Sequence, residues 1–233
     1  MHRLLDQYRV VLLDMHGTFM FDIDRFGPEQ DYAATYRRLG GTQLDDRAVN
    51  QLLTDWFAIL LRHYDSDQFE DCFPSLTELL TAVTALPESE MALLEAVFAN
   101  HERGVVPPAH ATAVSQLAER FDLAIVSNLW APSRYWQQPL QESGLWPRFK
   151  ARVFSSDTRY IKPHPNLFHL ALEQLGARAD EAVMIGDSFS RDVVGAQRAG
   201  IDAIWIDAAA WLKGELPAPA KAVIPDLPYL TLP

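Results

Sequence analysis

Residues 10–21 read VVLLDMHGTFMF, a run of four apolar residues that ends on Asp14 and continues through a His-Gly-Thr step. The apolar, partly β-branched composition of this run predicts a buried strand. Two other apolar runs end in the same way, on Ser127 after AIV and on Asp187 after VMIG. Each polar residue therefore stands where the chain is expected to leave a sheet.

Short apolar runs alternate with helical segments from about residue 107 onward. The expected strands are residues 122–127, 151–156, 182–187 and 201–207, and helical segments such as 165–176 and 191–200 separate them. Such alternation is typical of parallel strands joined by crossover helices. The strand before Asp14 belongs to the same sheet, and residues 221–224 add an edge strand. We therefore predict an α/β fold with a Rossmann-like three-layer core around a parallel sheet.

The middle of the chain has a different pattern. Residues 28–104 carry apolar side chains at three-to-four spacing, and no short β-rich run interrupts them. The tetrapeptide SLTE, Ser75 to Glu78, has the pattern of a capping box at a helix start. An inserted α-helical cap domain is thus predicted at residues 20–105, and the α/β core domain at residues 1–19 and 106–233.

The charge balance excludes several classes of partner. The 233 residues include 20 Lys and Arg against 31 Asp and Glu, which gives a formal net charge of −11. Because the sequence offers no continuous series of basic residues, we do not expect the protein to bind nucleic acid or an anionic membrane surface. No apolar stretch reaches membrane-spanning length. Cys72 is the single cysteine and rules out an intramolecular disulfide, so a cytoplasmic location is expected. We also expect a monomer or homodimer.

The polar residues at the strand ends have two interpretations. Taken singly, Asp14, Ser127 and Asp187 are ordinary turn formers and helix caps. Taken together, they converge on a ligand, because open α/β sheets bind ligands at the carboxyl ends of their strands.

Four motifs occur in order along the predicted core: DMHGT at residues 14–18, VSN at 126–128, KPHP at 162–165 and GDSFSRD at 186–192. On these motifs the chain resembles the haloacid dehalogenase superfamily of hydrolases, of the phosphatase type with a helical cap. The resemblance implies a magnesium-dependent hydrolase of small phosphorylated metabolites that acts through an aspartyl-phosphate.

The resemblance also assigns roles to residues. Asp14 is the nucleophile, and Mg²⁺ is held by Asp14, Asp187 and the main-chain carbonyl of His16, with Asp192 in an outer position. The implied phosphate-binding residues are Thr18, Ser127, Asn128 and Lys162. A carboxylate and a phosphate repel each other, so the site needs cations such as Mg²⁺, which prefers oxygen ligands, and the Lys162 ammonium group.

His16 departs from the family's pattern. The position two after the nucleophile normally holds a second aspartate, which protonates the leaving alcohol and deprotonates the attacking water. Imidazole titrates near neutrality and is able to serve both transfers. Neighbouring carboxylates favour its charged form whereas bound Mg²⁺ disfavours it, and the sequence does not rank the two effects. The alternative is a catalytically inactive protein that binds a phosphorylated ligand or a protein partner.

Other reactions of the superfamily fit less well. Metal-independent dehalogenases do not need the acidic fourth motif that Asp187 and Asp192 supply here. Phosphonate cleavage of the family type uses a cap lysine, and residues 1–149 contain no lysine. Within the cap, Arg25 and His63 are candidate substrate contacts, although charged residues on helices more often face solvent. Trp130, which closely follows the VSN motif, is expected to border the pocket.

Overall fold

A computed structural model of the chain describes residues 3–83 and 86–231. Within these residues, six strands form one parallel sheet in the order β3-β2-β1-β4-β5-β6. The strands are β1 (Val10–Leu13), β2 (Asp122–Ser127), β3 (Phe149–Phe154), β4 (Ala182–Gly186), β5 (Asp202–Ile206) and β6 (Ala222–Ile224). The predicted α/β fold with a parallel sheet is confirmed.

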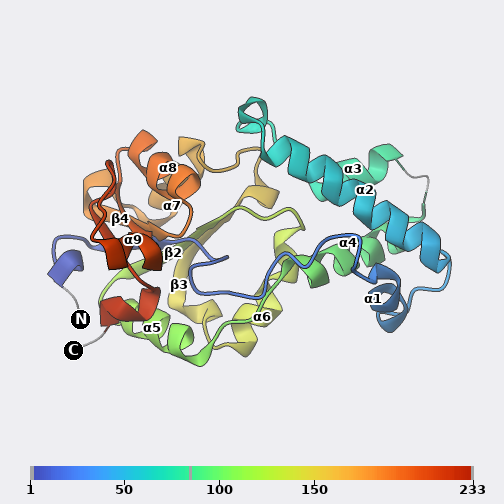
Figure 1. The fold of residues 1–233 in the computed structure, drawn as a ribbon, viewed down its shortest axis with the longest axis horizontal. Coiled ribbons are helices and arrows are strands. Elements are labelled where there is room, and N and C mark those ends of the chain that lie inside the picture. Colours follow the sequence, from blue (N-terminus) through green and yellow to red (C-terminus); the bar gives the residue numbers. More distant parts are fainter. Residues whose placement is uncertain (1–2, 84–85, 232–233) are drawn as a thin grey trace.

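The sheet is the middle layer of three. The core helices are α5 (Pro108–Ala118), α6 (Gln137–Glu142), α7 (Pro165–Leu175), α8 (Val194–Arg198) and α9 (Ala208–Lys213). Alternate residues of β1 point to opposite faces of the sheet. Val11 and Leu13 join a hydrophobic cluster with α5, whereas Val10 and Leu12 join a second cluster with α7 and α8. Figure 1 shows α5 on one side of the sheet and α7 and α8 on the other.

Strand β1 lies at the centre of the sheet. Val10 pairs with Asp122 of β2 on one side and with Ala182 of β4 on the other, although both partners come from the second half of the chain. All four residues of β1 are buried, as its unbroken apolar run predicts for a strand covered on both faces. The carboxyl ends of β1, β2 and β4 therefore meet at one edge of the sheet.

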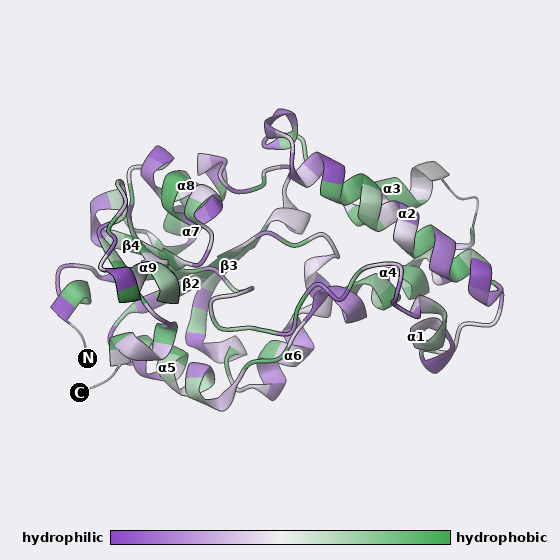
Figure 2. Cartoon of the chain, in the orientation of Figure 1, coloured by the Kyte–Doolittle hydropathy of each residue, from purple (hydrophilic) through white to green (hydrophobic). Residues whose placement is uncertain are grey.

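Between β1 and α5 the described residues form four α-helices: α1 (Tyr32–Arg38), α2 (Asp46–Tyr64), α3 (Leu76–Val83) and α4 (Glu88–Glu102). They pack around a third hydrophobic cluster that includes Tyr36, Leu53, Trp56 and Phe98. In Figure 1 they lie to one side of the sheet, and Figure 2 shows apolar and polar residues mixed along α2, as an amphipathic helix requires. The exact bounds of the cap domain, residues 20–105, stay a prediction.

The capping box predicted at residues 75–78 is present. The amide of Glu78 donates to Ser75 Oγ at 3.1 Å, and the amide of Ser75 donates to Glu78 Oε2 at 2.9 Å. The two connections to the inserted helices run side by side, because Phe21 and Val105 exchange main-chain hydrogen bonds of 2.9 and 2.8 Å. No helix among the described residues is long and apolar enough to cross a membrane.

Candidate active site

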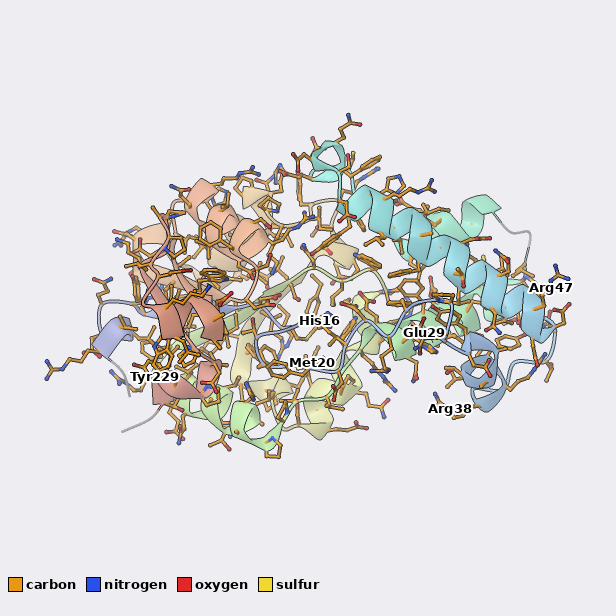
Figure 3. The ribbon with its side chains drawn as sticks, viewed as in Figure 1. His16, Met20, Glu29, Arg38, Arg47 and Tyr229 are labelled. Atoms are coloured by element: carbon orange, nitrogen blue, oxygen red, sulfur yellow. The ribbon has the colours of Figure 1, made fainter. Side chains whose placement is uncertain are left out.

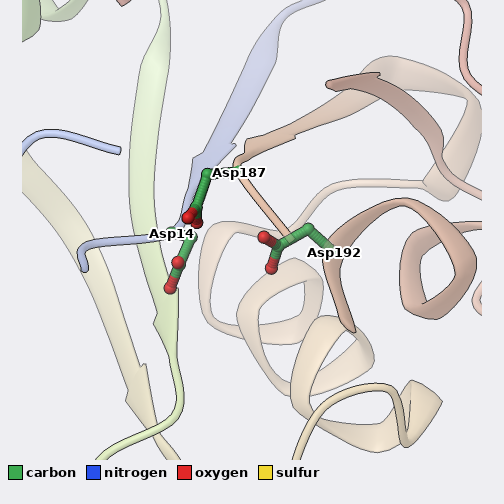
Figure 4. A group of neighbouring side chains, drawn as sticks. All are labelled: Asp14, Asp187 and Asp192. Atoms are coloured by element: carbon green, nitrogen blue, oxygen red, sulfur yellow. The ribbon is translucent and has the colours of Figure 1, made fainter. Parts of the chain in front are cut away.

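Three carboxylates meet at the carboxyl edge of the sheet. Asp14 follows β1, Asp187 follows the neighbouring strand β4, and Asp192 lies in a single π-helical turn (Phe189–Val193) after β4. Each offers an oxygen that lies within 4.8 Å of those of the other two. Figure 4 shows Asp14 and Asp187 next to each other, with the Asp192 carboxylate pointing toward them. Parallel pairing of β1 and β4 thus brings together two acids that are far apart in the sequence.

Lys162 is the cation of this cluster. Its side chain is buried, and its Nζ lies 2.8 Å from Asp14 Oδ1 and 2.6 Å from Asp192 Oδ1. Burial alone lowers the pKa of Lys162, but the charges of Asp14 and Asp192 outweigh burial and raise that pKa above its usual value. Lys162 is therefore charged where it meets the predicted nucleophile.

Ser127 and Asn128, the polar residues after β2, take different positions. Ser127 Oγ donates to Asp14 Oδ1 at 2.8 Å, so its hydroxyl lies directly at the nucleophile. The side chain of Asn128 holds the main chain of Lys162 instead: its Oδ1 accepts the Lys162 amide at 2.8 Å and its Nδ2 donates to the Lys162 carbonyl at 3.3 Å. Asn128 thus positions the lysine. Thr18 is buried and does not line the cavity described below.

The cluster contains three carboxylates and one ammonium group, so negative charge is in excess. Two of the carboxylates accordingly have raised pKa values. Burial, together with Asp14 and Asp192, raises the pKa of Asp187 to about 7. Burial and Asp14 raise the pKa of Asp192 to about 6, although Lys162 acts in the opposite direction. Converging carboxylate oxygens with excess negative charge fit Mg²⁺, which takes oxygen ligands.

Gly17 allows Asp187 to approach the turn after β1. Its φ is +73°, and a Cβ on this residue would lie 2.2 Å from Asp187 Oδ2. A side chain at position 17 is therefore incompatible with this placement of the second acid. The glycine of the DMHGT motif is needed for the geometry of the acidic cluster as well as for the turn.

His16 lies beside the cluster, between the sheet and the inserted helices (Figure 3). Its ring centroid is 5.0 Å from that of Trp136, and its buried Nε2 has no hydrogen-bond partner among the described residues. Burial lowers the pKa of His16 to about 4, even though Asp14 acts to raise it. Burial, which the sequence did not reveal, therefore favours the neutral imidazole.

A cavity of about 310 Å³ opens over the acidic cluster. On the core side its lining includes Asp14, His16, Ser127, Asn128, Trp130, Lys162, Asp187, Ser188 and Arg191. On the side of the insertion it is lined by Ile23, Asp24, Phe57, Leu61, Tyr64 and Glu102. Trp130 borders the cavity, as its position after the VSN motif predicts.

The predicted cap contacts lie elsewhere. The Arg25 guanidinium donates to the carbonyls of Asn100 at 2.6 Å and Arg103 at 2.9 Å, so it ties together the two connections to the insertion. The His63 ring packs edge-on against Phe69, 4.0 Å between centroids. Neither Arg25 nor His63 lines the cavity. Arg25 contacts main-chain carbonyls and His63 contacts an aromatic ring, and their role as substrate contacts stays a prediction.

Three charged lining residues were missed from the sequence. Arg191 donates to the Lys162 carbonyl at 2.8 Å and to the Tyr64 carbonyl, and its place beside Asp192 in GDSFSRD was an available signal. Asp24 and Glu102 come from opposite ends of the insertion and meet through the Asp24 amide, which donates to the Glu102 carbonyl at 3.1 Å. No local pattern connects these two acids.

Comparison with known proteins agrees with this geometry. The model of the haloacid dehalogenase-like hydrolase family matches residues 92–206. A phosphoserine phosphatase of Thermus thermophilus is 32% identical over 131 residues, which are 56% of this chain and 52% of that enzyme. The chain thus spans about half the length of this relative. A pyrophosphatase, PpaX, of Bacillus mycoides is 29% identical over 199 residues, 81% of this chain and 87% of the relative.

A solved structure extends the likeness to nearly the whole chain. The HAD phosphatase from Thermococcus onnurineus superposes with a TM-score of 0.59 and 26% identity over 94% of each chain. The family match covers the strands that supply Ser127 and Asp187, and the structural match extends over 94% of the chain. The chain is thus similar to the haloacid dehalogenase-like hydrolases in sequence over residues 92–206 and in fold over nearly its whole length.

Proposed function

We propose that the protein is a magnesium-dependent hydrolase of small phosphomonoesters, with Asp14 as the nucleophile. The observation that carries this proposal is the surroundings of Asp14 Oδ1, which accepts hydrogen bonds of 2.8 Å from both Ser127 Oγ and Lys162 Nζ. A hydroxyl and an ammonium group aimed at one carboxylate suit a site in which that carboxylate meets a phosphate. Phosphatases among the relatives support the same reaction class.

The proposed reaction has two displacements. The Asp14 carboxylate attacks phosphorus, the bond from phosphorus to the alcohol oxygen breaks, and an aspartyl-phosphate forms. Water then attacks phosphorus, which releases inorganic phosphate and restores the carboxylate. Ser127 and Lys162 hold phosphate oxygens during both steps. Asp14 and Asp187 would hold Mg²⁺, which neutralises phosphate charge when bound, and Asp192 keeps Lys162 in place.

Proton transfer is the step in which this chain departs from the pattern of the superfamily that it resembles. The alcohol must gain a proton as it leaves, and the attacking water must lose one. His16 occupies the position of the usual acid and base, but its buried Nε2 has no partner among the described residues that would orient it. We expect the unmodified protein to be a slow phosphatase, because a well-placed general acid or base contributes roughly 10²–10⁴-fold.

The first prediction concerns turnover. With Mg²⁺ and a panel of small phosphate esters, we expect measurable release of inorganic phosphate from the unmodified protein. His16→Asp should increase kcat by about tenfold or more, because it supplies a carboxylate for proton transfer. Asp14→Asn should lower kcat by at least about 10³-fold, because it removes the nucleophile. Phosphate release is measured colorimetrically.

The same panel tests the non-catalytic alternative. If neither the unmodified protein nor His16→Asp releases phosphate, the hydrolase proposal is wrong. Binding of phosphate esters without turnover, measured by calorimetry, would then favour a phosphate-ligand binding protein.

A further inference from the structure

We propose that the cavity selects phosphomonoesters whose alcohol carries a protonated amine and disfavours those that carry a second negative charge. This inference rests on the proposed function, because it takes the acidic cluster as the phosphate end of the cavity. It concerns the opposite wall, which the inserted helices and their connections supply. That wall carries two acids, Asp24 and Glu102, and no basic side chain among the described lining residues.

Asp24 is the acid available to a ligand. Asp24 is exposed and lines the cavity, and no hydrogen bond joins its carboxylate to another described residue. Its backbone has φ +53°, a conformation that non-glycine residues seldom adopt, and its amide donates to the Glu102 carbonyl at 3.1 Å. Strained backbone of this kind is concentrated at functional sites.

Glu102 stands behind Asp24 as a fixed second acid. It is 2% exposed, and its two carboxylate oxygens accept the amides of Trp130 at 2.7 Å and Ala131 at 2.8 Å. Burial and then Asp14 raise the pKa of Asp24 to about 6, and burial and then Asp24 raise the pKa of Glu102 to about 8. A cationic group of a ligand beside Asp24 and Glu102 favours the ionised form of both carboxyl groups. An anionic group of a ligand would be repelled by them.

The aromatic rings where this wall meets the core suit an ammonium group. The ring of Trp130 lies 5.6 Å from that of Phe57 and 5.6 Å from that of Tyr64 between centroids, and all three residues line the cavity. Aromatic faces attract cations through their quadrupole. The Arg191 guanidinium already lies 4.1 Å from the Tyr64 centroid, which shows a cation held by this group of rings.

Both basic side chains of the described lining belong to the core and are engaged. Lys162 pairs with Asp14 and Asp192, and Arg191 donates to the carbonyls of Lys162 and Tyr64. A second phosphate or a carboxylate on the substrate would therefore face Asp24 without a matching cation. Juxtaposed like charges are an effective means of rejecting a wrong ligand.

Three esters of matched size test the inference: 2-aminoethyl phosphate, 2-hydroxyethyl phosphate and carboxymethyl phosphate, which end in a cation, a neutral group and an anion. Calorimetric affinity and kcat/KM are measured for each at neutral pH with Mg²⁺. We expect the order amine, hydroxyl, carboxylate, with at least about tenfold between the first and the last, as for hydrogen bonds to charged groups.

Asp24→Asn should reduce the preference for the amine over the hydroxyl ester to less than about twofold, because it removes the charge. Asparagine tolerates positive φ, so the backbone is preserved. Asp22→Asn is the matched control. Asp22 has φ +56° and is also exposed, but it does not line the cavity, and its substitution should leave the preference unchanged.

The outcomes separate this inference from the hydrolase proposal. Turnover with preference for the hydroxyl or carboxylate ester overturns the inference and leaves the hydrolase intact. Tightest binding of the amine ester, lost in Asp24→Asn but with no turnover, supports the inference and overturns the hydrolase. Equal binding of the three esters, or a preference that survives Asp24→Asn, also overturns the inference.

Discussion

At the residue scale, Lys162 shows how burial changes the contribution of an ion pair to the stability of the fold. Its Nζ contacts two carboxylates in a site where all three side chains are nearly inaccessible to water. A buried pair contributes little net stability over an apolar replacement, but removing one partner leaves uncompensated buried charge. Substitution of Lys162 should therefore lower the free energy of unfolding strongly, even though the intact ion pairs add little to it.

We accordingly expect Lys162→Met to lower the free energy of unfolding by about 3–5 kcal/mol, because Asp14 and Asp192 lose their counter-charge. Lys150→Met is the matched control. Lys150 is 65% exposed and pairs with Asp122 at the surface, so about 1 kcal/mol or less is expected. Urea unfolding of the two variants measures both values, and similar small losses would contradict this account of Lys162.

At the scale of the element, the turn after β1 decides whether the acids meet. The strand delivers Asp14 to the sheet edge, and the turn must then leave space for Asp187 from β4. Gly17 provides that space through its missing side chain and its positive φ.

Gly17→Ala should lower Mg²⁺ affinity by about tenfold or more, in the range found when residues that orient metal ligands are replaced. The reason is that the new Cβ displaces the Asp187 carboxylate. Gly144→Ala serves as control, because Gly144 has φ +72° and nothing within 4 Å of an added Cβ. Both variants should lose about 1–2 kcal/mol of stability from the left-handed conformation, but only Gly17→Ala should lose metal affinity in calorimetry. Unchanged Mg²⁺ affinity in Gly17→Ala would show that position 17 does not constrain Asp187.

At the scale of the whole molecule, Glu102 joins the inserted helices to the core. It ends α4 and accepts two amides from the loop after β2. Its pKa is raised from 4.5 to about 8, chiefly by burial and then by Asp24. Between these values the folded protein keeps a proton that the unfolded chain has released, so this residue's contribution to stability falls as the pH rises through that window.

Glu102→Gln should remove the part of the pH dependence of stability that Glu102 contributes. The unfolding free energy of the unmodified protein minus that of the variant should decrease from about pH 5 to about pH 8, by at most ~1.4 kcal/mol per pH unit. The variant is also expected to be less stable at low pH, because its amide group cannot accept both main-chain hydrogen bonds. Glu88→Gln, an exposed position in the first turn of α4, should retain the dependence of the unmodified protein. A difference that stays constant with pH would show that Glu102 titrates normally.

The sequence by itself determined the sheet, the helical insertion and the chemical nature of the residues at the carboxyl edge of the sheet. Apolar strands, the capping box at Ser75 and glycine turns are encoded by near neighbours, so they can be read locally. Asp14, Ser127, Lys162 and Asp187 lie at or near the ends of such elements, and parallel pairing brings any such residues to one edge.

Only the tertiary structure decided what the remaining residues do. Asn128 positions Lys162, Arg25 and His63 are engaged away from the cavity, and Asp24 meets Glu102 across the two connections of the insertion. Burial lowers the pKa of His16 and favours its neutral form, and no neighbour in sequence indicates its contact with Trp136. These outcomes depend on which surfaces the inserted helices bury against the core. Burial and charge proximity are properties of the packed molecule, and local sequence patterns do not contain them.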